Sequence, residues 1–190
     1  MGMLITGLVL FLGLHSLRLL APGLRARLVA RLGEGPWKGL YSLVSGVGLG
    51  LAVVGFGTAR AVPAVLYAPP AGLRGVAVAL MTVVFPLLFA AYLPGRIRTW
   101  VGHPLLAATV VWSLAHLLAN GRAADVLLFG AFFGWATAAW IALARRPPAP
   151  IRTLPASPLN DAIAVLGGLG VYTALLLGLH ARVFGVAPLG

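Results

Sequence analysis

The feature that most constrains this sequence is a series of apolar blocks, each about as long as a membrane is thick. A helix needs roughly 20 apolar residues to cross the hydrocarbon core of a bilayer. Six blocks approach that length, and they run from about Met3 to Ala21, Trp37 to Thr58, Gly72 to Leu93, His103 to Asn120, Ala123 to Leu143, and Leu159 to Phe184. The sequence therefore predicts an all-α fold, a polytopic transmembrane helical bundle of about six spans.

The composition excludes the main alternatives to a helical membrane protein. Hydrophobic residues make up 61% of the chain and charged residues 9%, whereas soluble domains carry about 25% charged residues. So few charges cannot cover the surface of a soluble globule. Closed barrels also span membranes, but the sequence lacks their short alternating strands. Because the chain has no cysteine, disulfides, thiol catalysis and Cys-ligated metals are excluded.

The positive charge of the chain predicts its orientation. There are 14 Lys and Arg against three acidic residues, a net charge of +11. Each basic stretch adjoins an apolar block, so we exclude nucleic acid as a partner and expect the lipid bilayer. Ten basic residues follow the first, third and fifth blocks: Arg18, Arg25, Arg27, Arg31, Lys38, Arg96, Arg98, Arg145, Arg146 and Arg152. The positive-inside rule puts these in the cytoplasm and both termini on the non-cytoplasmic side.

Small residues in two blocks predict where helices pack closely. In the second block Ser42, Gly46 and Gly50 recur every four residues, and Gly57 follows seven positions later. The sixth block is also rich in glycine, with GGLG at 167–170 and Gly178. Faces of this kind let two helix backbones approach each other in a membrane.

Other segments predict breaks and connections. Pro86 lies in the middle of the third block, where we expect a kink. Residues 24–32 form a short basic amphipathic stretch, and residues 145–158 form a proline-rich linker that cannot be helical throughout.

Four histidines are the candidate site residues, because polar groups inside a bilayer need partners and often mark function. Thr109, Ser113, His116 and Asn120 share one face of the fourth block, and Trp112 lies one turn before His116. We expect this polar stripe to face the interior of the bundle.

The other three histidines differ in position. His15 lies next to Ser16 near the end of the first block. His103 begins the fourth block, where its ring suits the headgroup region, and His180 lies near the outer end of the sixth block.

The two deeper histidines, His15 and His116, predict a haem site. Neutral imidazole is a good axial ligand for haem iron, and two facing helices commonly provide a bis-His site. The spacing H-x-x-x-H is absent from each block, so a shared ligand must join different helices. We predict haem b between His15 and His116, with His103 and His180 as alternative ligands, because the sequence alone does not choose the pair.

The acidic residues have structural interpretations. Asp125 and Asp161 lie near the starts of the fifth and sixth blocks, where we expect each carboxylate to cap its own helix. Glu34 belongs to the first loop. With no acid deep in the membrane, a proton pump is not predicted.

Several stretches of the chain resemble the NnrU family of bacterial inner-membrane proteins. They are LFLGLHSLR (10–18), LGEGPWKGLYSLVS (32–45), YLPGRI (92–97), HPLLAATVVWSLAHLLANG (103–121), DVLLFG (125–130) and LH-x-x-VFGV (179–186). They follow the family order, so we treat residues 1–190 as a single NnrU-like membrane domain. The resemblance implies a multi-pass protein of the bacterial inner membrane that supports expression or maturation of nitrite and nitric oxide reductase activity in denitrification. Those reductases or their maturation proteins are the partners it implies.

The chain is also similar to the membrane ζ-carotene isomerases, which are haem b proteins. That resemblance implies iron ligation by His15 and His116, with Trp112 and Ser113 at the cofactor site. The sequence departs from those relatives at Ser113, where they have a cysteine, and at Leu17, where they have a glycine. The missing thiol argues against a redox-dependent ligand switch but leaves a bis-His site possible.

Three functions therefore stay open at this point. The first is a haem b protein that acts as an electron carrier, a nitric oxide sensor or a maturation factor. The second is a haem-dependent isomerase of a lipid-soluble polyene such as ζ-carotene. The third is a cofactor-free interaction protein or small-molecule transporter, in which the histidines pair only with Thr109, Ser113 or Asn120.

Overall fold

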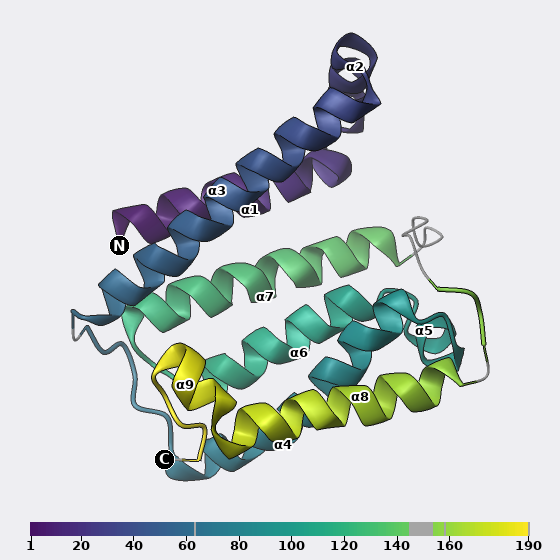
Figure 1. Ribbon diagram of the computed structural model, residues 1–190. Coiled ribbons are helices and arrows are strands. Elements are labelled where there is room, and N and C mark those ends of the chain that lie inside the picture. Colours follow the sequence, from purple (N-terminus) through teal and green to yellow (C-terminus); the bar gives the residue numbers. More distant parts are fainter. Residues whose placement is uncertain (63, 145–153, 158, 190) are drawn as a thin grey trace. The chain divides into compact units, whose positions relative to one another are not determined.

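The computed structural model describes residues 1–62, 64–144, 154–157 and 159–189, and helices dominate it (Figure 1). Five of its helical segments are long and apolar enough to cross a membrane: α1 (Gly2–Leu20), α3 (Glu34–Arg60), α4 (Ala71–Tyr92), α7 (Ala123–Leu143) and the segment Asn160–Phe184. A sixth apolar helix, α6 (Pro104–Ala119), has 16 residues and is about 24 Å long at the usual helical rise. The predicted all-α polytopic bundle is confirmed.

Two short helices connect these elements, and the chain divides into two compact units. The connecting helices are α2 (Pro22–Leu32) and α5 (Arg96–Val101). Unit 1 comprises Met1–Tyr67 and Gly121–Trp135, and unit 2 comprises Ala68–Asn120 and Ala136–Gly190. The predicted linker 145–158, with its three arginines, lies mostly outside the described residues.

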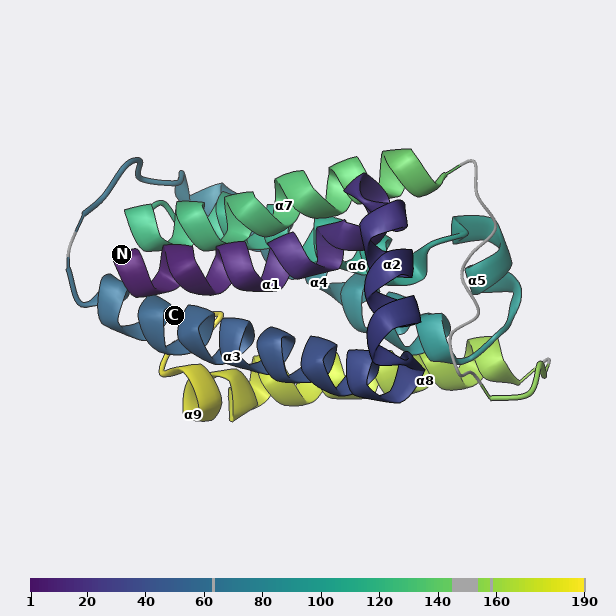
Figure 2. The same cartoon turned by 90° about the horizontal axis from the view of Figure 1, so that it is seen from above.

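Unit 1 is built on a close contact between α1 and α3, which run side by side in Figures 1 and 2. A Cβ atom at Gly55 would lie 2.8 Å from the Cα of Leu4, and one at Gly48 would lie 2.8 Å from the backbone nitrogen of Phe11. Gly7 of α1 likewise lies against the backbone of Ala52. Backbone contact at this range needs residues without side chains, as close helix pairs in membranes generally do.

The predicted packing face of α3 is wrong. A Cβ at Gly46, Gly50 or Gly57 would have nothing within 4 Å, and Ser42 is exposed. The contact face instead carries Gly48, Ala52, Gly55 and Ala59, which also recur at helical spacing. Two small-residue faces thus coexist on one helix, and the partner helix uses the one that the sequence pattern did not single out.

The first half of α7 completes the core of unit 1. Its Ala124 joins a buried cluster with Leu4, Leu8 and Leu12 of α1 and with Ala52 of α3. The loop after α3 is bonded to the start of α7, because Ala123 N–H donates to Ala64 O at 2.8 Å and Leu66 N–H donates to Gly121 O at 2.8 Å. These bonds satisfy backbone groups that a helix start otherwise leaves unpaired.

Unit 2 is built around α4, which packs against both α6 and α8 (Asn160–Ala174). Gly168 is buried against the backbone nitrogen of Pro86, and Gly167 lies against the ring of Phe89. The GGLG stretch is therefore a packing site, as expected. The Tyr172 hydroxyl donates to Val78 O at 3.0 Å. Helix α4 runs through Pro86 without interruption.

The sixth span is not one regular helix. A π-helical turn, η1 (Leu175–Leu179), separates α8 from α9 (His180–Phe184), and Gly178 has a φ of 142° and a ψ of −16°. Only glycine adopts that backbone conformation without steric cost. A Cβ at Gly178 would meet nothing within 4 Å, so this residue makes a break in the helix and not the close packing expected of it.

Asp161 does not cap its own helix as expected. Its carboxylate accepts hydrogen bonds from the backbone N–H groups of Arg96 at 2.8 Å and Ile97 at 3.1 Å. These are the first residues of α5, so Asp161 caps a helix start that lies more than 60 positions earlier in the chain. The neighbouring Asn160 donates to Pro94 O at 2.7 Å and Pro155 O at 3.1 Å. The pair Asn160–Asp161 thereby fixes the YLPGRI turn.

The α1–α3 contact makes a direct prediction for stability. We expect Gly55→Ala to lower the free energy of unfolding by about 1–3 kcal/mol, because the new methyl group would overlap the backbone of α1. The matched control is Gly50→Ala on the open face of the same helix, which should be neutral or slightly stabilising. Thermal unfolding of the purified protein in detergent compares the two, and equal Tm values would contradict the observed packing face.

Candidate functional site

His15 of α1 has a defined tautomer. Its Nδ1 lies 2.7 Å from the backbone oxygen of Phe11, one turn earlier in the same helix. A carbonyl can only accept, so Nδ1 carries the proton and donates it. In the neutral ring the lone pair is then on Nε2, which is the nitrogen able to bind a metal or accept a proton.

Aromatic side chains from three helices surround the His15 imidazole and form an aromatic niche, defined here as Phe11, Tyr41 and Trp135. The ring centroids lie 4.3 Å from His15 for Phe11, 5.4 Å for Tyr41 and 6.1 Å for Trp135. The Trp135 ring stands edge-on to the imidazole, at an interplanar angle of 89°. Helices α1, α3 and α7 each contribute one member of the niche, all within unit 1.

Ser16 fixes the Trp135 side of the niche. The indole Nε1–H donates to the Ser16 hydroxyl oxygen at 3.0 Å, and that hydroxyl donates to Leu12 O at 2.7 Å. On the other side, Trp37 is buried and its ring lies 6.2 Å from the Tyr41 ring. Ser16 is adjacent to His15 in the sequence, so its place beside His15 could be predicted. Tyr41 and Trp135 could not be predicted as neighbours, because no spacing in the sequence links them to residue 15.

His116 of α6 repeats the local arrangement of His15. Its Nδ1 donates to the backbone oxygen of Trp112 at 2.8 Å, which again leaves the lone pair on Nε2. The Trp112 ring lies 5.2 Å from the imidazole. In both helices an aromatic residue four positions earlier supplies the accepting carbonyl and a ring contact. The structure therefore brings Trp112 and His116 together in unit 2, while His15 belongs to unit 1.

The polar stripe of α6 is bonded to its own backbone. Thr109 donates to Leu105 O at 2.9 Å, Ser113 donates to Thr109 O at 2.6 Å and Val110 O at 3.1 Å, and the Asn120 amide donates to His116 O at 2.9 Å. Ser113 is completely buried. Back-bonding of this kind satisfies a hydroxyl in an apolar solvent without another side chain. The predicted cofactor contact of Ser113 would use the lone pairs that its oxygen keeps.

The other two histidines are held differently. His103 is the N-cap residue of α6, and its Nε2 donates to Leu143 O, the last carbonyl of α7, at 3.0 Å. Its ring thus satisfies an orphan carbonyl at a helix end. His180 begins α9, and its Nδ1 donates to Val186 O at 2.6 Å in an exposed position beside Phe184.

An ion pair that sequence reasoning missed lies at one end of unit 1. Arg60 Nε lies 3.4 Å from Asp125 Oδ1, and the Asp125 side chain is only 2% exposed. The contact is ionic, because Arg60 Nε has no hydrogen-bond acceptor in the part of the chain that the structure describes. The guanidinium also lies over the Phe56 ring, 5.4 Å from its centroid. Asp125 is in the first turn of α7, as expected, but its charge also balances a specific cation.

The ion pair affects its surroundings. Burial raises the pKa of the Tyr67 phenol, and the negative charge of Asp125 raises it further. Arg122 donates to the backbone oxygen of Arg60 at 3.4 Å, which ties the start of α7 to the end of α3. The sequence signal was present: Arg60 ends the second block and Asp125 starts the fifth, on the same predicted side of the membrane.

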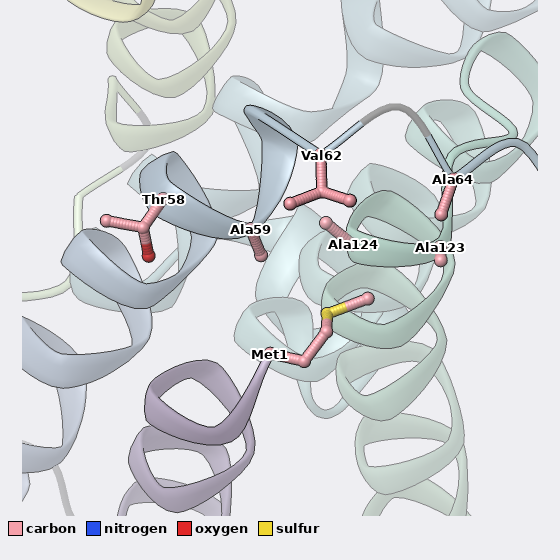
Figure 3. A pocket seen from close by; sticks show the side chains of 7 residues that line it. All are labelled: Met1, Thr58, Ala59, Val62, Ala64, Ala123 and Ala124. Carbon is pink, nitrogen blue, oxygen red and sulfur yellow. The ribbon is translucent and has the colours of Figure 1, made fainter.

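A cavity of about 220 Å³ lies at the same end of unit 1 (Figure 3). Its lining is almost entirely apolar: Met1, Thr58, Ala59, Val62, Ala64, Ala123 and Ala124. The one hydroxyl, on Thr58, donates to Gly55 O at 3.0 Å. A cavity without converging polar groups offers no chemistry for a reaction, so the histidines are the stronger candidates.

The buried ion pair gives a second prediction. We expect Asp125→Ala to lower the free energy of unfolding by about 3–5 kcal/mol, because it leaves the Arg60 charge without its partner in a mostly apolar setting. The control is Glu34→Ala, which breaks the Lys38–Glu34 pair at 2.8 Å on the exposed surface and should change stability by less than about 1 kcal/mol. Thermal unfolding in detergent measures both. If the Asp125→Ala protein were as stable as the Glu34→Ala protein, the Arg60–Asp125 pair would not contribute to stability.

Comparison with known proteins identifies the family. The model of the family described as NnrU protein matches residues 3–188 of the chain, as the resemblance predicted. No curated protein and no solved structure matches it. In the described ranges, no three His, Cys, Asp or Glu residues lie close enough together to hold a metal ion.

Proposed function

This chain belongs to the NnrU family, and from that premise we propose that it binds haem b through His15 and His116 and supports nitrite and nitric oxide reductase activity in the bacterial inner membrane. The observation that carries the proposal is the shared tautomer of the two histidines. Each ring donates Nδ1–H to the carbonyl one turn earlier, so in each neutral ring the lone pair is on Nε2. Metal-binding histidines commonly have this second hydrogen bond, because it orients the ring and raises its basicity.

The residues around His15 fit an iron porphyrin. The aromatic niche offers apolar ring surfaces, and such surroundings suit a large flat macrocycle whose iron accepts an imidazole. Trp112 provides a similar ring beside His116. When bound, haem would supply one-electron transfer and an affinity for nitric oxide. The protein's own contribution would be to hold two oriented imidazoles beside aromatic rings.

The same criterion ranks the alternative ligands lower. His103 uses Nε2 to bond Leu143 O, so a metal would have to displace that bond or approach the other nitrogen. His180 keeps Nε2, but its ring is bonded to Val186 O, a carbonyl beyond the end of α9 and outside the sixth span.

The proposal predicts a specific absorption spectrum. Protein purified from haem-replete cells should show a Soret band and, after reduction, the α and β bands of haem b, with the pyridine haemochrome confirming the type. His15→Ala and His116→Ala should each reduce the haem content per protein at least tenfold, because an axial donor is lost. His180→Ala is the matched control and should keep the wild-type spectrum.

Two results would count against the proposal. One is a colourless protein that also develops no Soret band when haemin is added, which would favour a cofactor-free interaction protein. The other is a spectrum that survives both the His15 and the His116 substitution, which would assign the iron to other ligands. For the cellular role, a strain lacking the protein should regain nitrite and nitric oxide reductase activity with His180→Ala but not with His116→Ala.

A further inference from the structure

The surface of α2 has two chemically distinct parts. Leu24, Leu28 and Leu32 recur every four residues and form one stripe, which we call the leucine face. Arg25, Arg27 and Arg31, the α2 arginines, lie to both sides of that stripe when placed at 100° per residue. The helix has no buried residue, and Leu24 and Leu32 are 42% and 44% exposed. An exposed apolar stripe bordered by arginines is typical of helices that lie in a membrane interface.

The α2 arginines form no salt bridge with the acidic residues that the structure describes. Of the residues that the structure describes, no carboxylate lies within salt-bridge distance of any of the three. The nearby Glu34 is paired with Lys38 at 2.8 Å. Arg27 and Arg31 are one helical turn apart, and like charges at that spacing repel. A negatively charged surface outside the protein would remove this repulsion.

The connections of α2 place it at the edge of the membrane. Helix α1 ends at Leu20, and α2 begins directly after Ala21 with Pro22, whose fixed φ suits the first position of a helix. At its other end Gly33 has a φ of 85° and leads straight into α3. Figure 2 shows α2 running across the ends of α1 and α3. Helices α1 and α3 are long and apolar enough to cross a membrane, and a helix that runs across the ends of two spans lies along the membrane surface.

We propose that α2 lies flat in the membrane interface, with its leucine face among the acyl chains and its arginines bound to the phosphates of anionic phospholipids. Charge complementarity selects the lipid, because three cations on one short helix, none of them in a salt bridge with a described residue, attract an anionic leaflet more strongly than a zwitterionic one. Guanidinium groups also bind phosphate oxygens in a bidentate manner. This proposal stands independently of haem binding.

The depth of each face can be measured because the chain has no cysteine. Leu24→Cys and Ala26→Cys, each labelled with an environment-sensitive fluorophore, place the probe on the leucine face and on the opposite side. Both parent residues are exposed. In vesicles of equal parts phosphatidylcholine and phosphatidylglycerol, the probe at 24 should emit blue-shifted light and be quenched by doxyl-labelled lipid. The probe at 26 should be quenched by aqueous iodide. If the probes at 24 and 26 were equally exposed to water, the proposal would be overturned.

The choice of anionic lipid is tested by charge. Each arginine at an anionic surface contributes about a fivefold increase in binding, so Arg27→Gln with Arg31→Gln should weaken retention of phosphatidylglycerol about 25-fold. Native mass spectrometry of the full chain released from nanodiscs of the same lipid mixture counts the retained lipids. Arg74→Gln with Arg182→Gln removes the same charge elsewhere and should retain wild-type numbers. Equal loss in both double variants, or in neither, would overturn the assignment to α2.

Discussion

The constraint on which this structure depends is that a polar side chain without a partner is costly in an apolar solvent. An unpaired polar group in hydrocarbon costs several kcal/mol. In α1 and α6 the partner is usually the backbone carbonyl one turn earlier: Ser16 bonds Leu12, and Thr109 bonds Leu105. This solution needs no second helix. It lets apolar spans with few charged residues carry hydroxyls and imidazoles. For His15 and His116 it also fixes the tautomer of the ring.

Much of the fold could be predicted from the sequence, because the length of an apolar block directly limits a spanning helix. The fifth block was predicted from Ala123 to Leu143, and α7 has those bounds. The faces of the helices were harder to predict. Glycine recurs on two faces of α3, and only the shape of α1, with Gly7 and Leu4 at the contact, selects the face with Gly48 and Gly55. The break at Gly178 was missed because hydropathy does not report backbone conformation.

The two candidate ligands could be predicted from the sequence, but the residues that surround them could not. A histidine in an apolar block is conspicuous, so His15 and His116 could be found from the sequence. Their tautomers could not, since these depend on which carbonyl a ring nitrogen reaches. Nor could the distant partners: Trp135 reaches Ser16 across 119 positions, and Asp161 reaches Arg96 across 65. Contacts of that separation leave no periodic trace in a single sequence.

The position of a histidine along its helix decides which nitrogen remains available. Inside a helix the carbonyl one turn back already accepts its backbone N–H, but its oxygen has a second lone pair, and Nδ1 is the ring nitrogen close enough to reach it. The lone pair of the neutral ring is then on Nε2, as for His15 and His116. At a helix end the nearby orphan carbonyls belong to other elements, and His103 uses Nε2 on the last carbonyl of α7. His180, at the start of α9, instead uses Nδ1 on Val186 O, so at a helix end the choice of ring nitrogen depends on which carbonyl lies near.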